Sequence, residues 1–176
     1  MWRYCRTRET GIIPLHCLPN KEDKEGRNND FSKRSRYGIR ALIDLARNAE
    51  NGSMQLNEIA DRNSISVKYL EQIFASLRKA GIIKSIKGPQ GDYLLARPSK
   101  DIRAADIIVT LDGNYFLNSE EVQGDGKGKM NASIVQREII EPVNGWAEHF
   151  FNTLTLEKPA ECAKEQEEAL QNMYYI

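Results

Sequence analysis

Apolar side chains recur at spacings of three and four residues from position 31 onward, which is the period of an amphipathic α-helix. One such stripe predicts a first helix that stops at the turn-forming residues 51–53. A second stripe predicts a short helix that ends near Asn63. The first stripe comprises Gly38, Leu42, Leu45, Ala46 and Ala49, and the second comprises Leu56, Ile59 and Ala60. Two helices are therefore expected before residue 64.

A third helix is predicted directly after a tight connection at Ser64 and Ile65. Ser66 is a good N-cap for this helix, because its hydroxyl group can accept a backbone N–H of the first turn. Gly81 is expected to end the helix as its C-terminal cap. The apolar face comprises Val67, Leu70, Ile73 or Phe74, and Leu77.

Residues 82–86 and 93–97 are predicted to be two short strands of a β-hairpin. The connecting residues 87–92 contain two glycines and one proline, which favour a turn with positive φ angles. Pro98 ends the second strand, and Asp101 is expected to cap a fourth helix that closes at Asp112-Gly113. Two helices joined by a short turn, followed by a hairpin, are typical of a winged helix-turn-helix module. The predicted fold is mainly α with a small β-hairpin, and this domain is expected over residues 31–113.

A long helix is predicted in the C-terminal part of the chain, after a polar, Gly-rich loop over residues 114–130. Residues 131–176 are expected to hold this helix and an acidic terminal helix or tail. Pro142 either kinks the long helix or starts its second half. The apolar face is too large to be left in water, so it packs on the domain or on a second subunit. That face comprises Ile134, Ile139, Ile140, Val143, Trp146, Ala147, Phe150 and Leu154.

The first 30 residues are predicted to be a flexible extension, because their one apolar cluster is interrupted by Pro14 and His16. This cluster is too short and too broken for a secretory signal, so a cytoplasmic location is expected. No segment approaches the roughly 20 apolar residues that cross a bilayer, which excludes an integral membrane protein. The three cysteines, Cys5, Cys17 and Cys162, are too few and too scattered for a disulfide framework or a zinc finger.

The formal net charge of zero hides a strongly uneven distribution along the chain. Residues 1–30 carry a net charge of +1, residues 31–103 carry 14 basic and seven acidic side chains, and residues 104–176 carry five basic and 13 acidic ones. The middle segment is therefore basic, at +7, and the last is acidic, at −8. Such asymmetry indicates a polyanion-binding segment, and two ordinary solvated surfaces of opposite sign are the alternative.

The third predicted helix carries the side chains that suit base recognition in DNA. Lys68, Glu71, Gln72 and Ala75 share the face opposite Leu70. Glutamine pairs bidentately with adenine, glutamate accepts from cytosine, and lysine reaches guanine or phosphate. Further basic residues that suit phosphate or minor-groove contacts are Lys33, Arg34 and Arg36 at the start of the first helix, and Lys84 and Lys87 in the hairpin. As an alternative, Glu71 and Gln72 are solvated helix residues and the glycines only shape a tight hairpin.

Several segments match the pattern of one bacterial regulator family, namely residues 36–42, 58–60, 65–74, 77–81 and 84–96. The combination of Tyr69-Leu70-Glu71-Gln72 with Gly88-Pro89 is highly specific. The chain thereby resembles the Rrf-type winged-helix regulators, which include IscR, NsrR and CymR. The resemblance implies a homodimeric transcription regulator, a repressor or an activator, on a near-palindromic double-stranded DNA operator, with the long helix as the dimerisation helix.

The sequence pattern and the resemblance together indicate which residues form each surface. The expected DNA-binding residues are Arg34, Arg36, Ser66, Lys68, Tyr69, Glu71, Gln72, Lys87, Gly88, Pro89, Gln90 and Gly91. The expected dimerisation residues are Ile139, Val143, Trp146, Ala147, Phe150 and Leu154. Of these sets, the third-helix residues are expected to read bases and the wing to enter the minor groove.

Two departures from the family pattern affect the predicted DNA contacts and the predicted cofactor. Asp92 stands where the family usually has a second glycine of a Gly-Gly-Tyr sequence, and it would repel phosphates unless it points away. The sensing members carry three cysteines before the dimerisation helix to ligate an iron–sulfur cluster, whereas residues 104–142 contain none. The chain therefore looks more like the cluster-free branch that contains CymR, with no cofactor or metal and with a link to cysteine, sulfur or redox metabolism. Members of that branch can be controlled by a partner enzyme such as O-acetylserine sulfhydrylase.

Other chemistries find little support in the sequence, and no enzymatic activity is expected. The Gly-rich segment 124–129 has Met130 in place of the Ser or Thr of a phosphate-binding loop. His16 and His149 have no ligand set or catalytic partner nearby in the sequence. Two alternatives to a DNA-binding regulator of the cluster-free type stay open: a protein-interaction module that docks a metabolic enzyme, and an iron–sulfur sensor in which Cys162 joins ligands from elsewhere.

Overall fold

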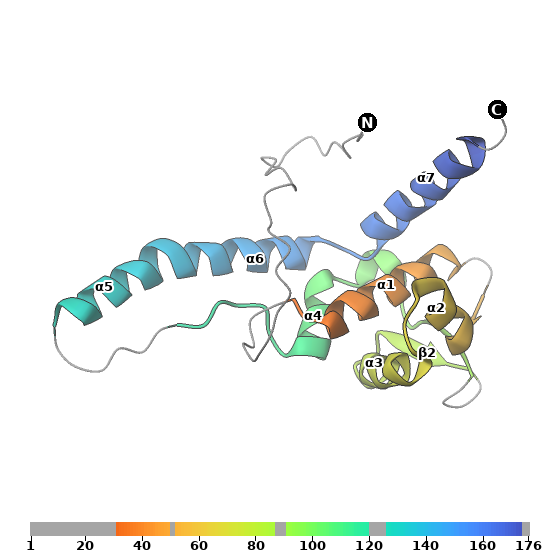
Figure 1. The fold of residues 1–176 in the computed structure, drawn as a ribbon, viewed down its shortest axis with the longest axis horizontal. Helices are drawn as coiled ribbons and strands as arrows, with labels where there is room; N and C mark the ends of the chain where they lie inside the picture. Colours follow the sequence, from red (N-terminus) through yellow and green to blue (C-terminus); the bar gives the residue numbers. More distant parts are fainter. Residues whose placement is uncertain (1–30, 50–51, 87–90, 120–125, 174–176) are drawn as a thin grey trace.

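The first helix, α1 (Lys33–Arg47), lies at the centre of a mainly helical molecule (Figure 1). The computed structural model describes residues 31–49, 52–86, 91–119 and 126–173. The predicted N-terminal extension of residues 1–30 and the wing tip of residues 87–90 lie outside the described residues. Helix α1 begins at Ser32, whose hydroxyl group accepts the backbone N–H of Ser35, because the first turn of a helix leaves its N–H groups without intrahelical partners.

Two helices at a sharp turn follow, as predicted. Helix α2 (Leu56–Asn63) ends at Ser64, a non-glycine residue in the left-handed region with φ +54°. Helix α3 (Val67–Lys79) begins at Ser66, which caps it by accepting the backbone N–H of Tyr69. The short left-handed connection lets the chain reverse between α2 and α3, which confirms the helix-turn-helix.

The sheet has three antiparallel strands, one more than the predicted hairpin. Strands β2 (Ile83–Ser85) and β3 (Asp92–Leu95) form the expected hairpin, with slightly different ends. The additional strand, β1 (Met54–Gln55), pairs with the outer edge of β3 just before α2 begins. Two residues are too short for an alternating pattern, so only the pairing with β3 defines this strand.

The start of the fourth helix differs from the prediction. Asp101 belongs to a short 3-10 turn, η3 (Ser99–Asp101), and does not cap α4 (Ala104–Asp112). Arg103 occupies the N-cap position, and the carboxylate of Asp106 accepts its backbone N–H at 3.4 Å. Gly113, with φ +88°, ends the helix where the sequence predicts.

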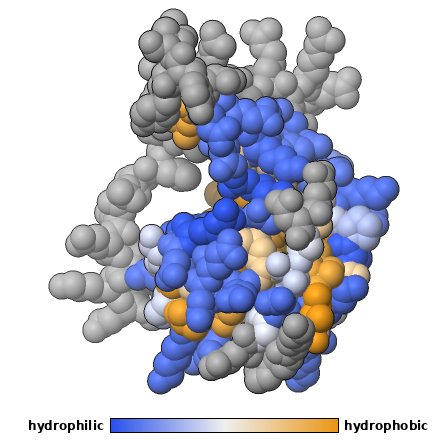
Figure 2. All heavy atoms as spheres, turned by 90° about the vertical axis from the view of Figure 1, so that its right-hand side faces the viewer, coloured by the Kyte–Doolittle hydropathy of each residue, from blue (hydrophilic) through white to orange (hydrophobic). Residues whose placement is uncertain are grey.

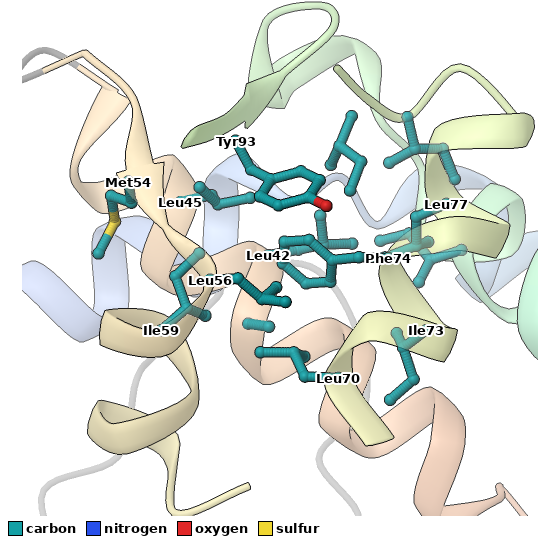
Figure 3. Close-up of a cluster of buried hydrophobic side chains, with 14 of the residues drawn as sticks. Leu42, Leu45, Met54, Leu56, Ile59, Leu70, Ile73, Phe74, Leu77 and Tyr93 are labelled. Carbon is teal, nitrogen blue, oxygen red and sulfur yellow. The ribbon is translucent and has the colours of Figure 1, made fainter. Parts of the chain in front are cut away.

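The hydrophobic core lies between α1, α2, α3, α4 and the sheet. Figure 3 shows Phe74 of α3 at its centre, where the ring packs edge-on against Tyr93 of β3 with ring centroids 4.9 Å apart. Leu42, Leu70 and Leu77 are fully buried around them. Seen from the side of α2 and α7, the described surface is mostly hydrophilic, with hydrophobic residues in small separate areas (Figure 2).

A long, nearly continuous helix reaches away from the winged-helix part (Figure 1). It consists of α5 (Lys127–Val135), the π-helical turn η4 (Gln136–Ile140) and α6 (Glu141–Thr153). It begins at Lys127, inside the segment expected to be a loop. Pro142 lacks the backbone N–H that would bond to the carbonyl of residue 138. The π-helical turn lies just before this proline, and there the N–H of Glu141 bonds to the carbonyl of Gln136. Pro142 thus stands at the start of the second half of the helix, as one of the two sequence alternatives predicts.

The last helix folds back onto the winged-helix part. Leu154, expected on the long helix, instead has an extended backbone after the end of α6, and its carbonyl accepts the N–H of Ala104 at 2.8 Å. Helix α7 (Glu157–Met173) then packs against α1, where Glu167 forms an ion pair with Arg47. The acidic C-terminal segment is therefore a helix attached to α1.

Candidate nucleic-acid interface

One face of α3 is polar and accessible, while the opposite face is buried in the core. Lys68, Gln72 and Ala75 are exposed and Glu71 is half-buried. The residues on the other side, Leu70, Ile73, Phe74 and Leu77, are completely buried. Burial of the apolar face fixes the rotation of the helix, so the polar residues predicted to read bases share one accessible surface.

The N-terminus of α3 is held by contacts to α1. The Tyr69 ring packs edge-on against Tyr37 of α1, with ring centroids 5.9 Å apart. Tyr69 is half-buried in this contact. This predicted DNA-binding residue therefore also holds the N-terminus of α3 against α1. Ser66 is exposed at the cap itself, where the partial positive charge of the helix N-terminus favours an anion such as phosphate.

A stripe of basic side chains on α1 lies beside this N-terminus. Lys33, Arg36 and Arg40 are exposed and spaced by three and four residues, so they share one side of the helix. Arg40 lies over the Tyr37 ring, 5.5 Å from its centroid, and donates to the carbonyl group of Asn63 at the end of α2. Because Tyr37 contacts Tyr69, the stripe flanks the first turn of α3. Arg40 is not among the DNA-binding residues predicted from the sequence. Its spacing of four residues from Arg36 is the signal that could have indicated it.

Arg34, also predicted to contact DNA, faces a different neighbour. Its Nη2 donates to the hydroxyl group of Ser76 on α3 at 2.6 Å, and its Nε is buried. The Ser76 hydroxyl in turn donates to the carbonyl of Gln72 at 3.3 Å. Arg34 therefore connects α1 to the C-terminal part of α3, while the neighbouring Arg36 stays accessible.

The base of the wing presents a lysine and an exposed apolar residue. Lys84 on β2 and Ile86 just after it are exposed, and Gly91 is half-buried directly before β3. Lys87, Gly88, Pro89 and Gln90 lie outside the described residues. Asp92, the departure from the family pattern, accepts a hydrogen bond from the hydroxyl of Ser53 at 3.2 Å. Its carboxylate is therefore directed toward the β1 edge of the sheet.

The buried phenol of Tyr93 connects the wing to α3 electrostatically. Burial raises the pKa of Tyr93, while the positive charge of Arg78 lowers it and the negative charge of Glu71 raises it. The net increase keeps this hydroxyl group protonated at neutral pH. Tyr93 thus serves as an uncharged core residue, beside Glu71 and Arg78 of α3.

The long helix exposes a continuous apolar face. Trp146 is 61% exposed and Ile139 is 54% exposed, and Val143 and Phe150 are also exposed. The rings of Trp146 and Phe150 stack with centroids 5.2 Å apart. Of the remaining residues expected at a dimer contact, Ala147 and Leu154 are half-buried. Such a large apolar face on one helix is characteristic of an interaction surface.

The described residues do not fit an iron–sulfur cluster. Among them, Cys162 on α7 is the one cysteine, half-buried, and residues 104–142 contain none. Cys5 and Cys17 lie outside the described part of the chain. Within that part, no group of three His, Cys, Asp or Glu side chains is close enough to hold a metal ion. Nor is any described helix both long and apolar enough to cross a membrane.

Comparison with known proteins agrees with this geometry. Residues 31–161 match the family model Rrf2, described as an iron-dependent transcriptional regulator. The chain is 33% identical to the HTH-type transcriptional regulator IscR of Klebsiella pneumoniae over 128 residues, which cover 72% of this chain and 76% of that protein.

Solved structures of two regulators are also similar. The structure of CymR, the global cysteine regulator of B. subtilis, matches with a TM-score of 0.63 and 33% identity, covering 75% of this chain and 96% of that one. IscR of T. potens matches with a TM-score of 0.57 and 36% identity, over 78% and 88% of the two chains. These relatives are named as regulators, which agrees with the expectation that the chain is not an enzyme. The chain belongs to the Rrf2 family of DNA-binding, winged-helix transcriptional regulators.

Proposed function

We propose that the protein is a cytoplasmic, homodimeric repressor that binds a near-palindromic operator through α3. The observation that carries this proposal is the accessible polar face of α3, which starts at a capped N-terminus and lies beside the basic stripe of α1. A helix of this kind fits the major groove, where its N-terminal residues reach base edges.

The side chains divide into base-reading and phosphate-binding groups. Gln72 and Lys68 project from α3 with no described protein partner, which supports a role in base recognition. Arg36 and Lys84 are exposed on either side of the helix, on α1 and the wing, and would bind the DNA backbone. Arg34 acts indirectly, because its bond to Ser76 holds α3 against α1. The expected wing residues 87–91 would enter the adjacent minor groove.

Dimerisation would bury the exposed apolar face of the long helix. A second copy is the occupant with matching chemistry, because its own face of Ile139, Val143 and Trp146 is equally exposed. A two-fold dimer would place two copies of α3 in successive major grooves, about 34–36 Å apart. Repression would then follow from occupation of the operator, and a reporter gene placed behind that operator would measure it.

The similarity to CymR supports a role in cysteine or sulfur metabolism, and the chemistry of the described residues supports a regulator without an iron–sulfur cluster. Control by a partner enzyme such as O-acetylserine sulfhydrylase stays a prediction from the resemblance. A colourless preparation purified under anaerobic conditions, without bound iron, is the expected result. A visible iron–sulfur chromophore would contradict the cluster-free proposal.

The test of the main proposal is selection of bound sequences from random DNA, followed by fluorescence anisotropy on the selected site. Gln72→Ala should weaken binding by about 1–3 kcal/mol and relax selectivity at one base pair per half-site. Gln171→Ala, the same change at an exposed position of α7, is the matched control and should bind as the parent protein does. If no sequence is enriched, or Gln72→Ala leaves affinity and selectivity unchanged, α3 does not read the operator.

A further inference from the structure

A cavity of about 460 Å³ lies where the winged-helix part meets the long helix. Its walls come from α4, from the residues that follow β3 and α4, and from the end of α6. The lining side chains that matter for its chemistry are Arg97, Arg103, Asp106, Val109, Tyr115 and Asn152. None of these residues belongs to the proposed DNA-binding surface.

Two arginines in this cavity share one carboxylate. Asp106 accepts from Nη2 of Arg97 at 2.9 Å and from Nη2 of Arg103 at 2.8 Å. Burial alone would raise the pKa of Asp106, but the hydrogen bonds and charges of Arg103, with the charge of Arg97, lower it overall. Asp106 is therefore ionised at neutral pH, and the three groups together carry one net positive charge.

Arg97 retains most of its hydrogen-bonding capacity. Its side chain is 42% exposed, and one of its five N–H donors has a protein acceptor within the described structure. Arg103 differs, because it bonds to Asp106 and also donates from Nη1 to Asn152 at 3.2 Å. The excess positive charge is thus presented mainly by Arg97, whose planar guanidinium group matches a carboxylate.

The rest of the cavity is partly apolar. Val109 of α4 is 48% exposed, although its neighbours Ile107 and Ile108 are buried. Ala80, Ile82 and Ala105 also line the space. The hydroxyl group of Tyr115 faces Asn152, whose Nδ2 lies 3.5 Å away. A positively charged group beside an apolar wall and a few polar atoms is typical of a site for a small organic molecule.

We propose that this cavity is an effector site for a small organic anion, in which a carboxylate pairs with Arg97 and a short aliphatic part contacts Val109. The site connects the DNA-binding part to the long helix, because Arg103 reaches from the N-cap of α4 to Asn152 of α6. A ligand held between these elements biases the angle of the long helix and so the spacing of the two recognition helices in the dimer. The inference rests on the proposed function for its effect on DNA.

The experiment uses the full chain with 4-methylpentanoate as the probe and its uncharged amide, 4-methylpentanamide, as the ligand control. Isothermal titration without DNA should show saturable binding of the carboxylate at up to about 10 mM and none of the amide. Arg97→Gln should abolish that binding, whereas Arg137→Gln, an exposed arginine of the long helix paired to Glu138, should retain it. Asp106 keeps its Arg103 partner in Arg97→Gln, so this variant is expected to fold.

A second pair of variants, both at Val109, tests the charge and the apolar wall of the site without removing an arginine. Val109→Glu adds a negative charge to an exposed helix position and should abolish carboxylate binding, while Val109→Gln should weaken it less. With operator DNA, the probe should change the affinity of the parent protein by about fivefold or more, and that of Arg97→Gln not at all.

Three results would overturn the proposal: no saturable binding of the carboxylate, equal binding by Arg97→Gln, or binding that leaves operator affinity unchanged. Titration without DNA tests the effector site independently of whether the protein binds an operator. A protein that binds its operator but not the carboxylate has lost the effector site alone. If the protein binds the carboxylate but no DNA, this result contradicts the proposed function as a DNA-binding regulator.

Discussion

Gly38 shows at the scale of one residue why a stripe of small and apolar side chains is needed on α1. A β-carbon at this position would lie 2.5 Å from Cδ1 of Leu111 on α4 and 3.3 Å from Cγ2 of Ile73 on α3. The first contact is closer than carbon atoms approach in proteins, and the second is shorter than their optimal separation of about 3.5–4.0 Å. The absence of a side chain therefore lets three helices meet at one point.

Gly38→Val should destabilise the fold, because the added methyl groups force Leu111 and Ile73 out of their packed positions. We expect a loss of about 1–3 kcal/mol in the free energy of unfolding, measured by urea denaturation. Gly145→Val is the matched control, since nothing lies within 4 Å of a β-carbon there and the residue is exposed on α6. Equal effects of the two changes would mean that Gly38 is not a packing residue.

Arg34 and Arg36 are two residues apart in sequence but should respond differently to mutation. Arg36→Ala removes an exposed charge, so it should weaken DNA binding similarly for all sequences and lower the salt slope by about one, without loss of stability. Arg34→Ala removes the bond to Ser76 and should lower the free energy of unfolding by roughly 1 kcal/mol. Anisotropy titrations over several salt concentrations, with parallel urea denaturation, measure both effects. An unchanged salt slope in Arg36→Ala would remove this residue from the interface.

At the scale of the element, the long helix combines two surfaces with different purposes. Its α6 half is held by the segment that follows α4, where the amide group of Asn144 bonds to both the N–H and the carbonyl of Leu117. The Phe151 ring contacts Tyr115 there, with centroids 5.0 Å apart. The apolar face from Ile139 to Phe150 remains exposed. One face of the element is thus held by the rest of the chain, and another face is available to a partner.

Val143→Glu tests whether a second copy covers this face. In a dimer the added carboxylate would be buried without a partner, which costs several kcal/mol, so we expect a monomer in analytical ultracentrifugation and weaker operator binding. Gly145→Glu places the same charge on the same helix at a position that is exposed and free of neighbours. It should leave the dimer intact. A parent protein that sediments as a monomer would contradict the proposed dimer directly.

At the scale of the whole molecule, the two oppositely charged segments contact each other in a limited way. The acidic helix α7 packs against α1, and its Glu167 pairs with Arg47, at the opposite end of α1 from Lys33 and Arg36. Figure 1 shows α7 and α3 on different sides of α1. The negative charge of α7 therefore lies away from α3, Lys33 and Arg36, and it comes nearest to the basic stripe at Arg40, which lines the same pocket as Glu167.

Removal of acidic charge from α7 should accordingly have little effect on DNA binding. Glu165 and Glu168 are exposed, and the double change Glu165→Gln with Glu168→Gln should alter operator affinity by less than about twofold at physiological salt, where the Debye length is about 8 Å. Anisotropy titration with the selected operator measures this. A large increase in affinity would indicate that α7 lies near the duplex and would contradict the architecture.

The sequence by itself determined the elements that local interactions specify. The buried stripe of α3, its cap at Ser66 and the end of α4 at Gly113 were all predicted, because helix period and capping depend on residues within one or two turns. The polar face of α3 followed from the same period. The family-specific segments lie in this region, so α3 was also the part of the fold that could be predicted best.

Only the tertiary structure decided which distant residues meet. Strand β1 exists through its pairing with β3, Arg34 is occupied by Ser76 on another helix, and Leu154 leaves the long helix to bond with Ala104. The effector cavity likewise brings Arg97 and Asn152 together from separate elements. Contacts of this kind depend on how buried faces orient whole helices, and no periodicity along the chain encodes the partner of an individual side chain.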